Sequence, residues 1–135
     1  MTPGFQGARS ALITIMSVAT AMALVACNSS ALPGTRLTQT ITGGDAQHGI
    51  ALIHSYGCGT CHTIPGIHDA SGLVGPPLYF FSRRTIIAGM LPNTPDNLIT
   101  WLENPQAVIP NNAMPYMAIG AQDATDIAAY LYTIR

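Results

Sequence analysis

The sequence contains no lysine and little charge of either sign. Only 8% of its 135 residues are charged. All of its fixed positive charge comes from five arginines: Arg9, Arg36, Arg83, Arg84 and Arg135. These arginines form no basic stripe, so we expect no nucleic-acid binding. The net charge of −1 also predicts that electrostatic steering of a protein partner is weak.

Strand signals and internal repeats are also missing. No alternating run of β-branched residues is joined by Asn-Gly, as a β-hairpin would require. The predicted fold class is therefore all-α, with three to four short helices and long loops. One helix should begin after Asp45, a short helical piece should cover 79–88, the next helix should begin at Thr94 and Pro95, and the last should cover about 121–133. Loops this long in so small a domain need something to organise them, such as a central cofactor.

The first part of the chain predicts export. Arg9 precedes an apolar run that is shorter than the roughly 20 residues a membrane span needs, which is typical of a secretory signal. The motif Leu-Val-Ala-Cys ending at Cys27 resembles a bacterial lipoprotein box. We expect a signal peptide at 1–26, a lipid-anchored flexible tether at 27–43 and a folded domain at 44–135. An ordinary signal with a chance cysteine and an uncleaved anchor helix are the alternatives.

The segment Cys58-Gly-Thr-Cys61-His62 carries the chemistry. Two thiols separated by two residues can reach both vinyl groups of one porphyrin, and the histidine that follows can ligate its iron. A zinc site would need a second pair of ligands, and Cys27 is the only other cysteine. A thioredoxin-like thiol oxidoreductase would need a βαβ context. We therefore expect one covalent haem c on Cys58 and Cys61, with His62 as an axial ligand.

A carrier iron needs a second axial ligand, and methionine raises its potential relative to histidine. Met114 lies in a proline-bounded loop before the last predicted helix and is the candidate. Met117 is its competitor, and a histidine or an open iron position are the other options. Met90 is expected in the core. The other histidines of the folded part are expected at the surface or in local contacts: His48, His54 and His68.

These residues resemble class I c-type cytochromes over nearly all of Gly44–Arg135. Gly75-Pro76-Pro77-Leu78 is similar to that family's loop in which a proline carbonyl accepts a hydrogen bond from the proximal histidine. The resemblance therefore implies that Pro76 or Pro77 holds the His62 ring. It also implies a crossing of the first and last helices, with a tyrosine ring filling the notch at a glycine: Gly49 and Tyr130.

The stretch from Ile87 to Pro115 is similar to the cytochrome c domains fused to or associated with haem-copper oxidase subunit II. In such domains a tryptophan and an arginine contact the haem propionates. The resemblance implies these roles for Trp101 and for Arg83 or Arg84.

The implied function is electron transfer in a respiratory chain by a membrane-anchored mono-haem cytochrome, with iron cycling between Fe(II) and Fe(III). We expect no enzymatic activity and no small-molecule substrate. Redox proteins, such as a membrane oxidase or dehydrogenase complex, are the expected partners. Lipid on Cys27 would anchor the exported chain to a bacterial membrane, facing the periplasm or the cell exterior. A haem-based peroxidase or gas sensor with an open iron position is the alternative.

Overall fold

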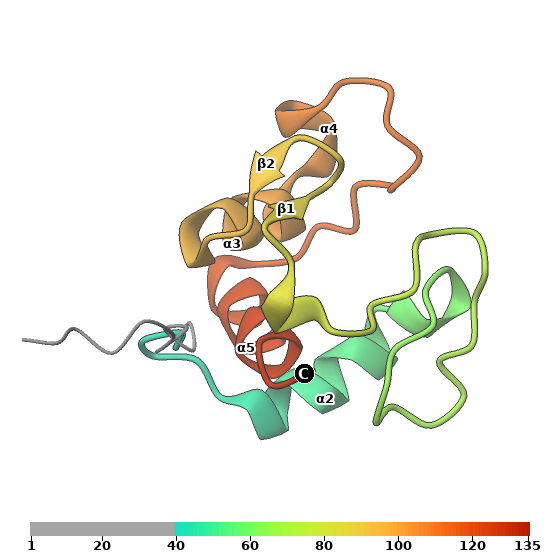
Figure 1. Cartoon of the computed structure of the whole chain (residues 1–135), viewed down its shortest axis with the longest axis vertical. Coiled ribbons are helices and arrows are strands. Elements are labelled where there is room, and N and C mark those ends of the chain that lie inside the picture. The colour runs from blue at the N-terminus through green and yellow to red at the C-terminus, as the bar shows by residue number, and fades with distance from the viewer. Residues whose placement is uncertain (1–39) are drawn as a thin grey trace, which may run out of the picture. The chain divides into compact units, whose positions relative to one another are not determined.

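A computed structural model describes residues 40–135. The predicted signal peptide, Cys27 and the tether up to residue 39 lie outside the described residues. The elements follow one another in this order: α2 (Ala46–Ser55), η1 (Cys58–Thr60), η2 (Phe81–Arg83), β1 (Ile86–Ile87), β2 (Leu91–Pro92), α3 (Pro95–Glu103), α4 (Pro105–Val108) and α5 (Ala121–Leu131). Within this part of the chain, four α-helices and the loops between them confirm the predicted all-α class (Figure 1). None of the helices in 40–135 has the length and apolar character that a membrane crossing requires.

The predicted helix starts are confirmed by side-chain caps. The Asp45 carboxylate accepts from the backbone N–H groups of Gln47 and His48 at 2.8 and 3.1 Å, which satisfies donors that a first helical turn leaves unpaired. Thr94 caps α3 by accepting from the N–H of Asn97 at 3.3 Å, and Pro95 is the first residue of that helix.

Pro105 ends α3 and also begins a helix that the sequence analysis missed. The Asn104 side chain accepts from the N–H of Ala107 at 3.0 Å, and Pro105 occupies the first position of α4. A proline fits there because a first-turn N–H would have no helical partner. The residue that stops one helix therefore starts the next.

The helical piece predicted for 79–88 is wrong over most of its length. Only the 3₁₀ turn η2 is helical, and β1 then pairs with β2 in a small antiparallel hairpin. Its turn places Ala88 and Gly89 at φ 51° and 78°, the two successive positive values that tight hairpin turns need. Ala-Gly provides this turn in place of Asn-Gly, so the signal was missed. Met90 lies beside the turn and is 64% exposed, so its predicted core position is also wrong.

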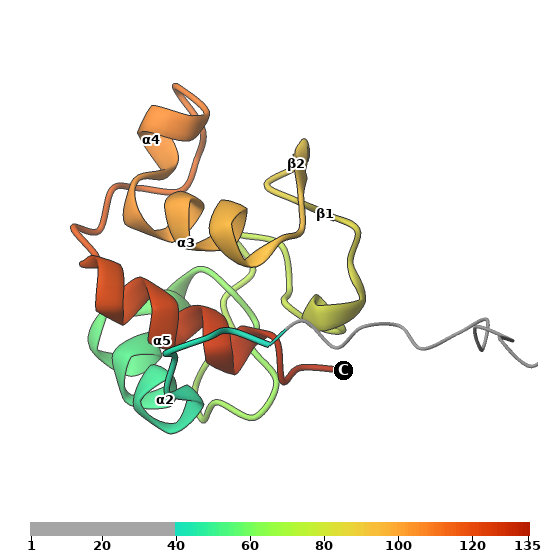
Figure 2. The same ribbon diagram turned by 90° about the vertical axis from the view of Figure 1, so that its left-hand side faces the viewer.

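The core forms where α5 packs against both α2 and α3 (Figure 2). A Cβ on Gly49 would lie 2.8 Å from the carbonyl carbon of Asp126, so only glycine lets the backbones of α2 and α5 approach this closely. The place of the Tyr130 ring at this notch stays a prediction. The hydroxyl of Tyr130 donates to the Pro65 carbonyl at 2.7 Å and so ties α5 to the loop after η1.

A buried carboxylate joins the start of α2 to α5. Asp126 is 3% exposed and accepts from the N–H of Asp45 at 2.8 Å, the amide of Gln122 at 2.9 Å and Nδ1 of His48 at 2.7 Å. The hydrogen bonds from Asp45 and then His48 lower the pKa of Asp126. The hydrogen bond to Asp126 raises the pKa of His48.

These shifts predict that His48 stabilises the fold only at acidic to neutral pH. The contribution of His48 is complete below its ordinary pKa of 6.5 and is lost as pH rises through its raised folded value. The contribution of Asp126 is present above its ordinary pKa of 3.8 and is lost as pH falls through its lowered folded value.

Thermal melts of the wild type and His48→Gln should therefore differ most between pH 3.8 and 6.5, with the wild type more stable. The difference should shrink at higher pH. His54→Gln, at another exposed histidine of α2, is the control and should show no such profile. A wild-type advantage that does not change with pH would contradict the pairing.

Candidate functional site

The segment from Cys58 to His62 forms one tight turn at the end of α2. Gly57 adopts a left-handed conformation, with φ 67°, and turns the chain out of the helix. The carbonyl of Cys58 then accepts from the N–H groups of Cys61 and His62 at 3.3 and 3.0 Å. Cys58 and Cys61 are half-buried free thiols. The turn thus places two thiols and one imidazole within five residues, and both thiols are available for covalent attachment.

A carbonyl orients the imidazole of His62. Its Nδ1 lies 2.8 Å from the carbonyl oxygen of Pro76. Since a carbonyl can only accept, Nδ1 carries the proton, and Nε2 keeps the lone pair that a metal needs. This partner sets both the tautomer and the orientation of the ring.

The loop around Pro76 is shaped by the ring that it holds. A Cβ on Gly75 would lie 2.6 Å from Nδ1 and 2.9 Å from Nε2 of His62, so the ring packs directly on the Gly75 backbone. The N–H of Gly75 donates to the carbonyl of Cys61 at 2.8 Å. The loop therefore closes back onto the Cys-His turn at Gly75.

Arg84 supports the same loop from the other side. Its guanidinium donates to the carbonyl of Pro77 and, at 3.1 Å, to that of Tyr79. It also lies 5.6 Å from the ring centroid of Phe81. Burial lowers the pKa of Arg84. Of the two prolines named from the sequence, Pro76 bonds to His62 and Pro77 bonds to Arg84.

The other two residues predicted at the haem propionates differ in setting. Arg83 is exposed, with its guanidinium carbon 5.8 Å from the ring centroid of Phe80. Trp101 is half-buried on α3, beside buried Leu102. Their place at the propionates stays a prediction.

Met114 lies in the loop between α4 and α5. Its side chain is half-buried and packs against the core, whereas Met117 is 36% exposed. In Figure 1 this loop projects to the same side of the molecule as the loop that follows η1. Sequence reasoning missed Gln106 and Asn112, which hydrogen-bond to the backbone of Met114. The sequence offered one signal that could have found them: both are amide side chains in a segment that contains no charged residue.

These residues fit a covalently attached haem. Two free thiols share one turn, the imidazole offers Nε2, and a half-buried thioether is available in a second loop. No three His, Cys, Asp or Glu side chains within 40–135 form a group that could hold a metal ion by themselves. The donor set therefore suits an iron that brings its own four porphyrin nitrogens.

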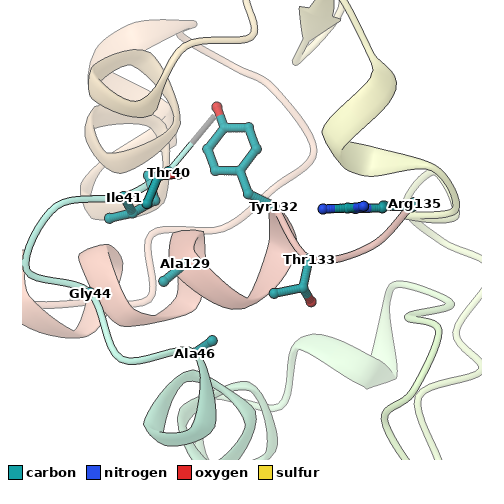
Figure 3. Close-up of a pocket in the computed structure, with 8 residues that line it drawn as sticks. All are labelled: Thr40, Ile41, Gly44, Ala46, Ala129, Tyr132, Thr133 and Arg135. Atoms are coloured by element: carbon teal, nitrogen blue, oxygen red, sulfur yellow. The ribbon is translucent and has the colours of Figure 1, made fainter. Parts of the chain in front are cut away.

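A cavity of about 460 Å³ lies elsewhere, between the segment before α2 and the end of α5 (Figure 3). Its lining includes Ile41, Ala129, Tyr132 and Arg135. It has no cysteine, histidine or methionine in its lining and shares no residue with the Cys-His turn. It is therefore not a candidate for the haem site.

Comparisons with known proteins point to one family. The family model described as Cytochrome c matches residues 46–135. Cytochrome c oxidase subunit 2 of Alkalihalophilus pseudofirmus is 32% identical over 91 residues, which is 67% of this chain but 26% of that relative. Cytochrome c2 of Rhodopila globiformis is 35% identical over 103 residues, covering 68% of this chain and 95% of that protein. The names of both relatives agree with the resemblances stated from the sequence motifs, namely to c-type cytochromes and to the cytochrome c domains of oxidase subunit II.

The close packing of His62 on Gly75 predicts a damaging alanine substitution. Gly75→Ala should displace the imidazole and lower the free energy of unfolding by about 1–3 kcal/mol, the usual cost of overpacking. Denaturant unfolding of the matured protein measures this, and its absorption spectrum should change as well. Gly120→Ala is the control, because a Cβ there meets nothing within 4 Å. Equal stability of Gly75→Ala and wild type would contradict this packing.

Proposed function

Because the chain belongs to the cytochrome c family, we propose that it is a mono-haem electron carrier held at a bacterial membrane by a lipid on Cys27. At the level of the family, its function is electron transfer by a c-type cytochrome and its cofactor is covalent haem c. The haem supplies an iron that exchanges single electrons between Fe(II) and Fe(III). The single observation that carries the proposal is the Cys-His turn with the His62 ring oriented by the carbonyl of Pro76.

In this proposal Cys58 and Cys61 hold the haem by thioether bonds, and Nε2 of His62 ligates the iron. The hydrogen bond to Pro76 keeps Nδ1 protonated and makes the imidazole a stronger electron donor. Such an orienting bond favours the oxidised iron, because a more basic ligand stabilises the higher charge. The packing of Gly75 and the support from Arg84 keep this bond in place during electron exchange.

Met114 is the proposed second ligand, and its thioether favours the reduced iron relative to a histidine ligand. The half-buried setting of its side chain, against the exposed setting of Met117, supports this choice. With both axial positions filled, the iron has no place for a substrate, which fits a carrier better than a peroxidase or gas sensor.

The proposed partners are membrane redox proteins that dock through uncharged surface. Residues 70–82 and 104–122 contain no Asp, Glu, Lys, Arg or His, and these segments include Pro76, Pro77 and Met114. Leu73 and Val74 are 87% and 79% exposed in the first segment. The match to part of a cytochrome c oxidase subunit 2 supports an oxidase as the partner, and a dehydrogenase complex would suit the same surface.

The anchor and the exported location rest on the motif that ends at Cys27. A lipid at this position would confine the carrier to the membrane face and raise its effective concentration near membrane partners. Residues 27–43 would then link the anchor to the domain, and the carrier would face the periplasm or the cell exterior.

Met114→Ala should lower the reduction potential by on the order of 0.1 V, within the roughly 0.8 V that axial ligands span, and should open the iron to carbon monoxide and cyanide. Met117→Ala is the matched control, three residues away, and should change neither. Potentiometry and ligand-binding kinetics measure both effects. The reverse pattern would overturn the assignment of Met114. Rapid carbon monoxide binding by the reduced wild type would instead favour the open-iron alternative.

Cys27→Ser should move the protein from the membrane fraction to the soluble fraction, because no acyl chains could be attached. Fractionation of the expressing cells, with intact-mass analysis of the mature chain, measures this. Ser29→Ala is the control and should leave the protein with the membranes. Membrane retention of Cys27→Ser would contradict the lipid anchor and favour an uncleaved anchor helix.

A further inference from the structure

Two amide side chains hold the backbone of Met114 from both sides. The Gln106 side chain donates to the carbonyl of Met114 at 2.8 Å and to that of Asn112 at 3.0 Å. The Asn112 side-chain oxygen accepts from the N–H of Met114 at 2.8 Å. Both backbone polar groups of one loop residue are therefore satisfied by side chains. We call Gln106 and Asn112 together the amide clamp.

The amide clamp is itself anchored in rigid structure. The amide nitrogen of Asn112 donates to the carbonyls of Pro105 and Ile109 at 2.8 and 2.7 Å. Pro105 is among the most deeply buried residues of the chain and begins α4. Gln106 is the second residue of that helix. Met114 is thus tied to α4, directly through Gln106 and indirectly through Asn112.

The loop needs this support because little else organises it. Its backbone has no regular element between α4 and α5, and it contains two residues with positive φ, Asn111 at 63° and Ala118 at 53°. Non-glycine residues adopt such values at an energetic cost, and surrounding contacts must impose them. Loss of the amide clamp would release the loop into more relaxed conformations, most of which place Met114 elsewhere.

From this geometry we propose that Gln106 and Asn112 are positioning residues that hold Met114 in place for the iron. The inference rests on the proposed function, in which Met114 is an axial ligand. A ligand on a loop binds its metal intramolecularly, so the fraction of molecules in which it is bound depends on its effective concentration at the metal. This effective concentration falls as the loop gains conformational freedom. The amide clamp would therefore set the fraction of molecules in which the thioether is off the iron.

The test is the rate of imidazole binding to the ferric holoprotein at low imidazole concentration, where the rate is proportional to the fraction of molecules whose methionine is off the iron. Gln106→Ala and Asn112→Ala should each raise this rate by about tenfold or more, because one hydrogen bond of ordinary strength is worth up to about tenfold and each variant loses at least two. The absorption band of methionine-ligated ferric iron should weaken in both variants. Haem content, measured by intact mass, should stay at one per chain.

Two further variants separate positioning from general destabilisation. Asn112→Asp keeps the oxygen that accepts from Met114 but turns a second acceptor oxygen toward the carbonyls of Pro105 and Ile109, so its rate should rise at least as far as that of Asn112→Ala. Gln106→Leu keeps much of the side-chain volume without the amide and should behave like Gln106→Ala. Asn97→Ala is the control, because it removes a similar amide bond, to the carbonyl of Pro92 at 2.9 Å, outside this loop.

The outcomes distinguish this inference from the proposed function. If Met114→Ala fails to open the iron, the ligation itself is wrong. If Met114→Ala opens the iron while the variants of Gln106 and Asn112 stay within twofold of the wild-type rate, the amide clamp alone is overturned. An equal increase in Asn97→Ala would also overturn it, because the effect would then be general.

Discussion

The hydrogen bond from Nδ1 of His62 to the carbonyl of Pro76 is the contact on which the proposed site depends. It determines which ring nitrogen can bind iron. It also needs a backbone that lies directly against the imidazole, which only a glycine at position 75 allows. The loop between η1 and η2 has no helix or regular strand of its own. Its conformation follows the ring that it holds, with Arg84 bonded to its other side.

Helix α5 connects this loop to the rest of the domain. Along one helix and its last turn, three side chains reach three different parts of the chain. Asp126 binds the start of α2, Tyr130 binds the carbonyl of Pro65, and Tyr132 donates to Asn93 at 2.8 Å. Asn93 in turn donates to the carbonyls of Phe81 and Arg84. A packed helix with these contacts thus ties together the start of α2, the loop after η1 and the segment around η2.

The low charge of the chain follows a pattern within this framework. Asp126 is buried but meets three donors, so its charge costs little and links two helices. The segments near the proposed iron ligands carry no charge. Their own hydrogen-bonding groups are neutral amides, hydroxyls and carbonyls. These two segments therefore contain no ionisable side chain that could titrate in response when the iron changes its charge.

Local features were predictable from the sequence. Spacing identified the Cys58–His62 motif, and the capping residues Asp45 and Thr94 marked two helix starts, because each acts on neighbours within a few positions. The family, the all-α class and the covalent haem followed from these features. The hairpin at β1 and β2 was missed, since Ala-Gly lacks the usual turn signature although Ala88 adopts the positive φ of such a turn.

The sequence by itself therefore determined the family, the cofactor and the local elements, because the residues responsible lie within a few positions of one another. Only the tertiary structure decided that Pro76 and not Pro77 bonds to His62, that the Tyr130 hydroxyl donates to Pro65, and that Gln106 reaches Met114. The physical reason is that these partners are brought together by loop conformation and helix packing. The partners in these pairs are separated by irregular distances along the chain, so no sequence pattern could indicate that they pair.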